Sequence, residues 1–130
     1  MEKKRTIGFD ADDTLWENEV FFHKAQVKFK KLHPHIKDPD GEIFQIEKKN
    51  IKLYGYGIKG FILSLIEASA KYSSNQTNIE NITEILNIGK EMLTHQLELL
   101  PGVEDTLKYL SGQFRLIMIT KGDLFDQQRK

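Results

Sequence analysis

Apolar and polar residues alternate in blocks along this chain of 130 residues, and each apolar block predicts one secondary-structure element. Residues 6–9 form a short apolar run that stops abruptly at acidic residues, which predicts a buried strand followed by a polar loop. Four later segments have apolar residues at helical spacing and predict helices. These segments cover approximately residues 17–32, 43–53, 58–72 and 82–93.

The breaks between these segments are rich in residues that favour turns. Residues 33–41, which include Pro and Gly, predict a turn, and residues 73–78 predict a polar linker. The carboxylates Asp38 and Asp40 lie in the first of these breaks. They are interpreted as part of the turn, because Asp favours turns.

The last third of the chain returns to short elements. A turn at residues 99–102 leads into a predicted amphipathic helix at residues 103–110, and an apolar run at residues 114–119 predicts a second buried strand. Residues 124–130 predict the start of another helix, with Asp123 as its N-cap. Parallel pairing needs a long crossover, so two strands joined through helices are expected to be neighbours in the parallel sheet of an α/β fold.

Composition and charge narrow the class of protein. Hydrophobic residues make up 39% and charged residues 29%, as in globular proteins, and the formal net charge is zero. Zero net charge argues against binding through bulk charge, so we expect neither a nucleic-acid nor a membrane partner. The lack of cysteine excludes a disulfide scaffold, and no apolar run approaches the roughly 18 residues of a membrane helix. We therefore expect a soluble cytoplasmic protein.

Two carboxylates, Asp10 and Asp12, directly follow the first predicted strand. Ligands of open α/β sheets bind at the carboxyl ends of the strands, so these two side chains can converge on one bound molecule. A carboxylate that is ionised at neutral pH can act as a nucleophile or as an oxygen ligand of Mg²⁺, which suits Asp10. Asp12 beside it suits general acid–base work.

The second predicted strand ends in Thr120, Lys121 and Gly122. A hydroxyl, a flexible glycine and exposed backbone N–H groups at a strand end can hold phosphate oxygens. Taken alone, a capped turn is the simpler explanation of these three residues. These three residues support a phosphate site only in combination with the acidic segment that follows the first predicted strand.

Together the two segments resemble motifs of a known family. Residues 7–15 form an apolar strand followed by Asp10, Asp12 and Thr14 in the pattern D-x-D-x-T, which resembles the first motif of the haloacid dehalogenase-like (HAD) hydrolase superfamily. Residues 116–120, an apolar strand that ends in Thr120, resemble its second motif. The resemblance covers residues 5–16 and 99–126, and the helices between them lie where the family inserts a helical cap.

This resemblance implies a fold and a domain organisation. We expect an α/β fold with a Rossmann-like core, incomplete in this chain, and an inserted all-helical cap. The core is expected to comprise residues 1–16 and 98–130, and the cap residues 17–97. Trp16, Phe21 and Phe22 are expected to pack in the cap rather than to bind substrate.

The resemblance also implies phosphoryl transfer through an aspartyl-phosphate, with Mg²⁺ as cofactor. Asp10 would attack phosphorus, and Asp12 would protonate the leaving oxygen and then activate water. Thr120 and the backbone of Lys121 and Gly122 would hold the phosphoryl oxygens. Mg²⁺ would be bound by the Asp10 carboxylate and the Asp12 backbone carbonyl. The expected activity is a phosphatase acting on a small phosphomonoester, since the dehalogenases of the family lack the acid at Asp12.

The family's third motif, a lysine, and its fourth motif, an acidic metal-binding loop, follow later strands than the two predicted here. The 130 residues are therefore expected to be the N-terminal part of a longer protein. Residues 122–126 superficially resemble the acidic motif but follow the wrong strand, so they are interpreted as a helix start. The alternatives are a phosphomutase, a phosphonate-cleaving enzyme of the same family, and a non-catalytic phosphate- or Mg²⁺-binding fragment. The sequence assigns no oligomeric state.

Overall fold

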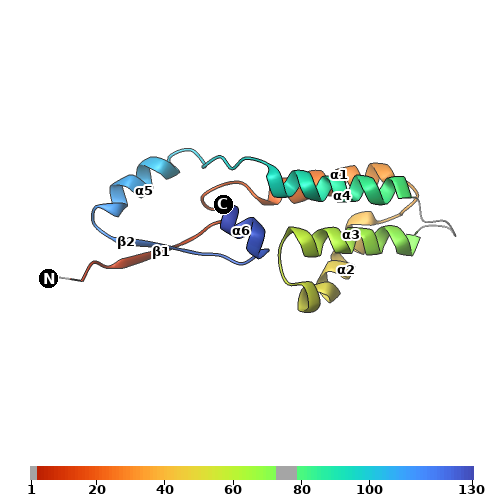
Figure 1. Ribbon diagram of the computed structural model, residues 1–130, viewed down its shortest axis with the longest axis horizontal. Coiled ribbons are helices and arrows are strands. Elements are labelled where there is room, and N and C mark those ends of the chain that lie inside the picture. Colours follow the sequence, from red (N-terminus) through yellow and green to blue (C-terminus); the bar gives the residue numbers. More distant parts are fainter. Residues whose placement is uncertain (1–2, 73–78) are drawn as a thin grey trace. The chain divides into compact units, whose positions relative to one another are not determined.

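The computed structural model describes residues 3–72 and 79–130 (Figure 1). The predicted linker at residues 73–78 lies outside the described residues. Within the described residues, two strands and six helices follow one another along the chain. They are β1 (Thr6–Asp10), α1 (Glu19–Leu32), α2 (Pro39–Tyr54), α3 (Ile58–Tyr72), α4 (Ile79–Thr94), α5 (Val103–Ser111), β2 (Arg115–Ile119) and α6 (Leu124–Arg129).

The chain divides into two compact units. The strand unit comprises Met1–Phe21 and Gln96–Thr120, and the helical unit comprises Phe22–His95 and Lys121–Lys130. This division follows packing alone. It does not test where the predicted core and cap begin and end, so those boundaries stay a prediction.

The two strands are parallel neighbours, as predicted. Thr6 of β1 lies opposite Arg115 of β2, and the register continues to Asp10 opposite Ile119. The connection between them contains the first five helices, and the last of these, α5, packs against β2 (Figure 1). The carboxyl ends of β1 and β2 therefore lie at the same edge of the sheet.

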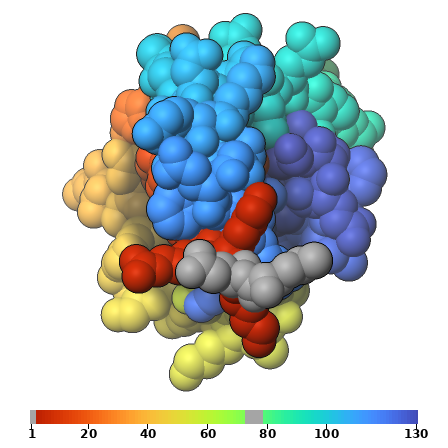
Figure 2. Space-filling model, turned by 90° about the vertical axis from the view of Figure 1, so that its left-hand side faces the viewer, coloured from red at the N-terminus to blue at the C-terminus, as the bar shows by residue number. Residues whose placement is uncertain are grey.

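The prediction that both strands are buried is wrong. Ile117, Met118 and Ile119 of β2 have 40%, 47% and 64% of their surface exposed. The described sheet has only two strands, so each strand lacks a neighbour on its outer side. Figure 2 shows α5 in blue beside the red N-terminal residues that lead into β1. Apolar residues on both faces of a strand suit a sheet covered on both faces, and a two-stranded sheet leaves such residues partly exposed.

The helical unit is built around α3. This helix packs against both α2 and α4 (Figure 1), and Phe22 contacts Phe61 edge-on, with ring centroids 5.0 Å apart. Apolar side chains from four helices fill the interior of the unit. The largest of those that are almost completely buried are Phe29, Ile43, Ile58, Leu65 and Ile85.

The predicted turn at residues 33–41 is shorter than expected, because α2 already begins at Pro39. Asp38 is the N-cap, and its carboxylate accepts a hydrogen bond from the backbone N–H of Gly41 at 3.2 Å. Pro39 suits the first helical position, where no intrahelical N–H bond is lost. Interpreting Asp38 and Asp40 as part of a turn was therefore wrong: Asp38 caps a helix, and Asp40 lies in its first turn.

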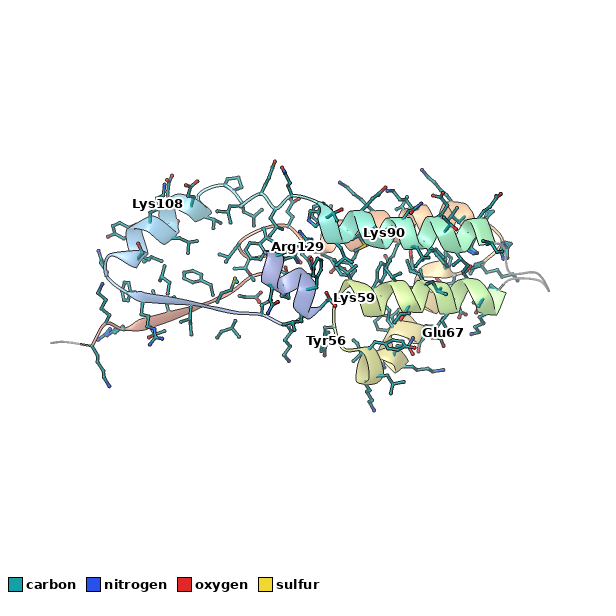
Figure 3. The ribbon with its side chains drawn as sticks, in the orientation of Figure 1. Tyr56, Lys59, Glu67, Lys90, Lys108 and Arg129 are labelled. Carbon is teal, nitrogen blue, oxygen red and sulfur yellow. The ribbon has the colours of Figure 1, made fainter. Side chains whose placement is uncertain are left out.

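The predicted helix start after β2 is confirmed as α6. The Asp123 carboxylate accepts a hydrogen bond from the backbone N–H of Asp126 at 3.0 Å, as expected of an N-cap. At the other end of α6, Arg129 donates hydrogen bonds to the carbonyl oxygens of Met92 and His95, each at 2.9 Å (Figure 3). Arg129 thereby satisfies carbonyl groups that the end of α4 leaves without intrahelical partners.

A histidine is buried inside the helical unit. His33 stacks on Phe29, with ring centroids 4.5 Å apart, and its Nε2 lies 2.8 Å from the Ser69 hydroxyl. Its Nδ1 lies 3.3 Å from the Phe29 carbonyl oxygen, which can only accept, so Nδ1 carries the proton of the neutral ring. Burial is the main cause that lowers the pKa of His33; nearby His35 lowers it further, and the bond to Phe29 opposes both.

The free energy of unfolding is therefore expected to fall in mild acid. Below the usual His pKa of 6.5, the unfolded chain takes up a proton that folded His33 resists, so stability decreases as pH falls through that value. Urea unfolding at pH 7.5 and pH 5 measures the difference. The His33→Gln variant should lose most of this pH dependence, whereas the exposed-site control His23→Gln should keep it. Equal pH dependence in all three proteins would contradict the prediction.

Candidate active site

The loop after β1 is a compact turn built from backbone hydrogen bonds. The N–H groups of Thr14 and Leu15 donate to the Ala11 carbonyl oxygen at 3.1 and 2.8 Å. The N–H of Asp13 donates to the Trp16 carbonyl oxygen at 2.7 Å. Asp13 has a φ of 62°, in the left-handed region that Asp tolerates better than most residues. The turn holds the side chains of Asp10 and Asp12 at the carboxyl end of β1.

Asp10 is the last residue of β1, and its side chain is exposed. The Thr14 hydroxyl donates a hydrogen bond to Asp10 Oδ2 at 3.0 Å. This contact orients the carboxylate and leaves it accessible from solvent. Asp10 therefore has the exposure that a nucleophile or a metal ligand needs.

Asp12 is half-buried in the turn. The indole Nε1–H of Trp16 donates a hydrogen bond to Asp12 Oδ1 at 2.8 Å. Trp16 is only 5% exposed and packs with Ala11 and Leu15 of the strand unit. Trp16 is therefore a packing residue, as expected, but Ala11, Leu15 and Phe9 around it belong to the predicted core and not to the predicted cap. The tight turn directs its ring back toward the strand end.

Asp13 has a role that the sequence analysis did not identify. Its Oδ1 accepts hydrogen bonds from the backbone N–H groups of Asn18 and Glu19 at 2.9 and 3.0 Å. These groups lie at the start of α1, where N–H groups lack intrahelical partners and a negative charge is favourable. The sequence signal that could have suggested this role is an acidic residue shortly before a helical pattern. Asp13 thus connects the acidic turn to the first helix.

Thr120 follows β2 directly. Its neighbour Ile119 lies opposite Asp10 in the parallel register, so Thr120 lies at the same sheet edge as the acidic turn. The structure therefore brings three of the predicted site residues together at this edge: Asp10, Asp12 and Thr120.

Lys121 and Gly122 belong to the helical unit. The Lys121 carbonyl oxygen accepts a hydrogen bond from Gln127 Nε2 at 3.1 Å, and its ammonium lies 5.7 Å from the centre of the Tyr56 ring. A Cβ added at Gly122 would lie 2.9 Å from the Gln127 side chain, which would have to shift to make room for it. These contacts describe a well-packed turn, and the phosphate-holding role of Lys121 and Gly122 stays a prediction.

The two acidic residues of the segment 122–126 form ion pairs with neighbouring basic side chains. Asp123 forms an ion pair with Lys59 at 3.2 Å, near the start of α3 (Figure 3). Asp126 is buried and pairs with Arg129 at 2.7 Å and with Lys130 at 3.2 Å. Both residues act in and around α6, which agrees with interpreting residues 122–126 as a helix start.

The donor set at the sheet edge fits a magnesium ion. Across residues 3–72 and 79–130, no group of three or more His, Cys, Asp or Glu side chains could hold a metal ion by itself. Mg²⁺ is usually held by one or two carboxylates and keeps several waters, so a crowded cluster is unnecessary. The exposed Asp10 carboxylate and the Asp12 backbone carbonyl are hard oxygen donors of the kind it prefers.

In the described part of the chain, no helix is both long and apolar enough to cross a membrane.

Comparison with solved structures identifies similar folds. A haloacid dehalogenase-like family hydrolase from Xanthomonas campestris is 33% identical, with a TM-score of 0.90 over 98% of this chain and 55% of that chain. YfnB from Bacillus subtilis, assigned to the HAD-hydrolases and bound to magnesium, is 17% identical, with a TM-score of 0.58 over 98% and 58%. A 2-haloacid dehalogenase from Pseudomonas syringae is 19% identical, with a TM-score of 0.55 over 91% and 55%.

The chain thus spans little more than half the length of these three structures. Among proteins with curated descriptions, none matches it. The family model described as haloacid dehalogenase-like hydrolase matches residues 4–130, almost the whole chain. The expected fold class is confirmed by this agreement between a mixed α/β structure and its structural neighbours. The chain belongs to the haloacid dehalogenase-like hydrolases.

Proposed function

We propose that the chain carries the nucleophile and the acid–base residue of a Mg²⁺-dependent phosphatase that hydrolyses a small phosphomonoester. The observation that carries the proposal is the pair of aspartates at the end of β1. Asp10 is exposed to solvent, and Asp12, two residues later, is held by a hydrogen bond from Trp16. A hydrolase that uses only one carboxylate has no need of the second.

In the first step, a carboxylate oxygen of Asp10 attacks phosphorus, and the bond from phosphorus to the leaving oxygen breaks. Asp12 supplies the proton that the leaving oxygen takes up. In the second step, Asp12 takes a proton from water, which attacks the phosphorus of the aspartyl-phosphate. Inorganic phosphate leaves, and both aspartates return to their starting states.

Charge is the main obstacle to this chemistry, because an anion attacks an anionic phosphate. Bound Mg²⁺ would neutralise charge on the phosphoryl oxygens. Thr120, at the same edge as Asp10, offers a hydroxyl to a phosphoryl oxygen. The proposed backbone donors of Lys121 and Gly122 follow directly in the chain and would add to this binding.

Two substrates distinguish the proposed activity from the other activity named among the similar structures. The full-length protein should release p-nitrophenol from p-nitrophenyl phosphate, lose that activity in EDTA and regain it on addition of Mg²⁺. It should release no chloride from 2-chloropropionate. Chloride release without phosphatase activity would overturn the proposal in favour of a dehalogenase. Absence of both activities, together with absence of phosphate binding, would contradict it as well.

Loss of the Thr120 hydroxyl should weaken binding of the phosphoryl group. We expect Thr120→Ala to reduce kcat/KM by an amount that corresponds to about 1–3 kcal/mol, the scale of a hydrogen bond to a charged group. Thr120→Ser should restore most of the loss, because it restores the hydroxyl. Thr83→Ala, at an exposed position of α4, is the matched control and should leave kcat/KM unchanged. Equal activity of Thr120→Ala and the wild type would remove Thr120 from the site.

A further inference from the structure

Trp16 is the single tryptophan of the chain, and its side chain connects the candidate site to the interior of the strand unit. Its indole Nε1–H donates to Asp12 Oδ1 at 2.8 Å. Tryptophan has no other polar group in its side chain, so this contact satisfies the only hydrogen-bonding atom of the ring. The interaction joins a nearly buried ring to a half-buried carboxyl group.

The indole is held in place from several sides. Ala11 and Leu15 form a buried cluster with Trp16, and three partly buried apolar side chains pack against this cluster. The backbone of Trp16 forms bridges with Asp12 and with Leu99, and the Leu100 N–H donates to the Leu15 carbonyl oxygen at 2.8 Å. The three packing residues are Phe9, Leu97 and Val103. The ring therefore has little freedom to move away from Asp12.

A carboxyl group that transfers protons must present an oxygen in a defined direction, and rotation about the Cβ–Cγ bond of Asp changes that direction. A hydrogen bond from a fixed donor restricts the rotation. Trp16 supplies such a donor to Asp12, and its packing makes the donor rigid. This arrangement is the kind of support from neighbouring residues that a catalytic group needs to remain in productive geometry.

We infer that Trp16 is a positioning residue for Asp12: its indole N–H orients the carboxyl group that protonates the leaving oxygen and activates water. The inference rests on the proposed function, in which Asp12 is the acid–base residue. It assigns to Trp16 a contribution to turnover and not to substrate binding, because the indole is buried.

The kinetic test removes the donor and keeps an aromatic ring. In the full-length protein, Trp16→Phe should lower kcat about tenfold and leave KM within about twofold, the scale expected for loss of one hydrogen bond to a charged group. Val103→Ala is the matched control, because it reduces packing in the same cluster but leaves the indole N–H in place and Ala11, Leu15, Phe9 and Leu97 around the ring. Its kcat should stay close to wild type. Equal losses of kcat in both variants would assign Trp16 a purely structural role.

A double-mutant cycle with Asp12 separates this inference from the proposed function. If Trp16 acts through Asp12, Trp16→Phe should cause no further loss of kcat in an Asp12→Asn background. Additive losses would overturn the inference. If Asp12→Asn itself has no effect on turnover, the proposed function fails. If Asp12→Asn slows turnover and Trp16→Phe does not, only the role of Trp16 fails.

A second readout does not depend on activity. In a ¹H–¹⁵N spectrum of the full-length protein, the indole N–H of Trp16 gives a side-chain cross-peak that is assigned by its loss in Trp16→Phe. In Asp12→Ala this peak should move upfield, and its N–H should exchange with water at least tenfold faster. Asp105→Ala, at an exposed position of α5, is the control and should leave both properties unchanged. An indole signal that is insensitive to Asp12→Ala would show that the contact is absent in solution and would overturn the inference.

Discussion

Replacing Asp10 by Asn should abolish phosphatase activity in the full-length protein while the fold is retained. Asparagine has the shape of Asp but lacks the anion that attacks phosphorus, and loss of a nucleophile costs roughly four orders of magnitude or more in kcat. The Thr14 hydroxyl, now 3.0 Å from Asp10 Oδ2, can donate equally well to an amide oxygen. The measurement is the rate of p-nitrophenyl phosphate hydrolysis, with circular dichroism to confirm that the variant is folded.

The matched control for this experiment is Asp105→Asn, which changes an exposed carboxylate on α5 by the same chemistry. It should hydrolyse the ester at the wild-type rate. An Asp10→Asn variant that keeps activity within about tenfold of wild type would exclude Asp10 as the nucleophile. Removal of the attacking group should cost far more activity than this.

Asp12→Asn should slow turnover by about 10²–10⁴-fold, the usual contribution of a general acid–base group, and should let the phospho-enzyme accumulate. p-Nitrophenolate leaves readily without a proton, so formation of the aspartyl-phosphate needs little help from Asp12. Its hydrolysis still needs a base to activate water. The Trp16 N–H can donate to the amide oxygen of Asn as it does to Asp12 Oδ1, so the side chain should keep its position.

Intact-mass measurement during turnover detects the adduct directly. The phosphoryl mass should appear in Asp12→Asn and be absent from Asp10→Asn under the same conditions. If Asp12→Asn turns over at the wild-type rate, Asp12 is not the acid–base residue. A slow variant without an adduct would contradict its role in hydrolysing the intermediate.

Most secondary structure could be predicted because its signals are local. The apolar spacing of residues 58–72 predicts α3 with the bounds that the structure has, and the run before Thr120 predicts β2 to within one residue. Asp123 was predicted as an N-cap and is one. These signals depend on the period of a helix or a strand and on the bonding needs of helix ends, which a short stretch of sequence carries by itself.

The start of α2 was misplaced because the same residues serve two structures. Pro39 and Asp38 favour turns, and they also suit the first position and the N-cap of a helix. The sequence of residues 33–41 is compatible with both. The helix prevails because Ile43 and Ile46 are buried in the helical unit, and a helix that begins at Pro39 carries them on one face.

The candidate site was only partly accessible to sequence reasoning. The order of motifs placed Asp10, Asp12 and Thr120 together, since parallel strands put their carboxyl ends at one edge. The partners of these residues were not foreseen. Asp13 was not recognised as a cap for α1, and Trp16 was assigned to cap packing, although it contacts Asp12.

By itself the sequence determined the elements, the parallel pairing of two strands and the family, because these follow from short-range patterns and from motif order. Only the tertiary structure decided which side chains of the acidic turn contact one another. The left-handed backbone at Asp13 turns the chain back, so that the buried Trp16 ring reaches Asp12. The tertiary structure also decided how much of β2 is exposed, because the burial of a strand depends on the neighbours that the fold places beside it.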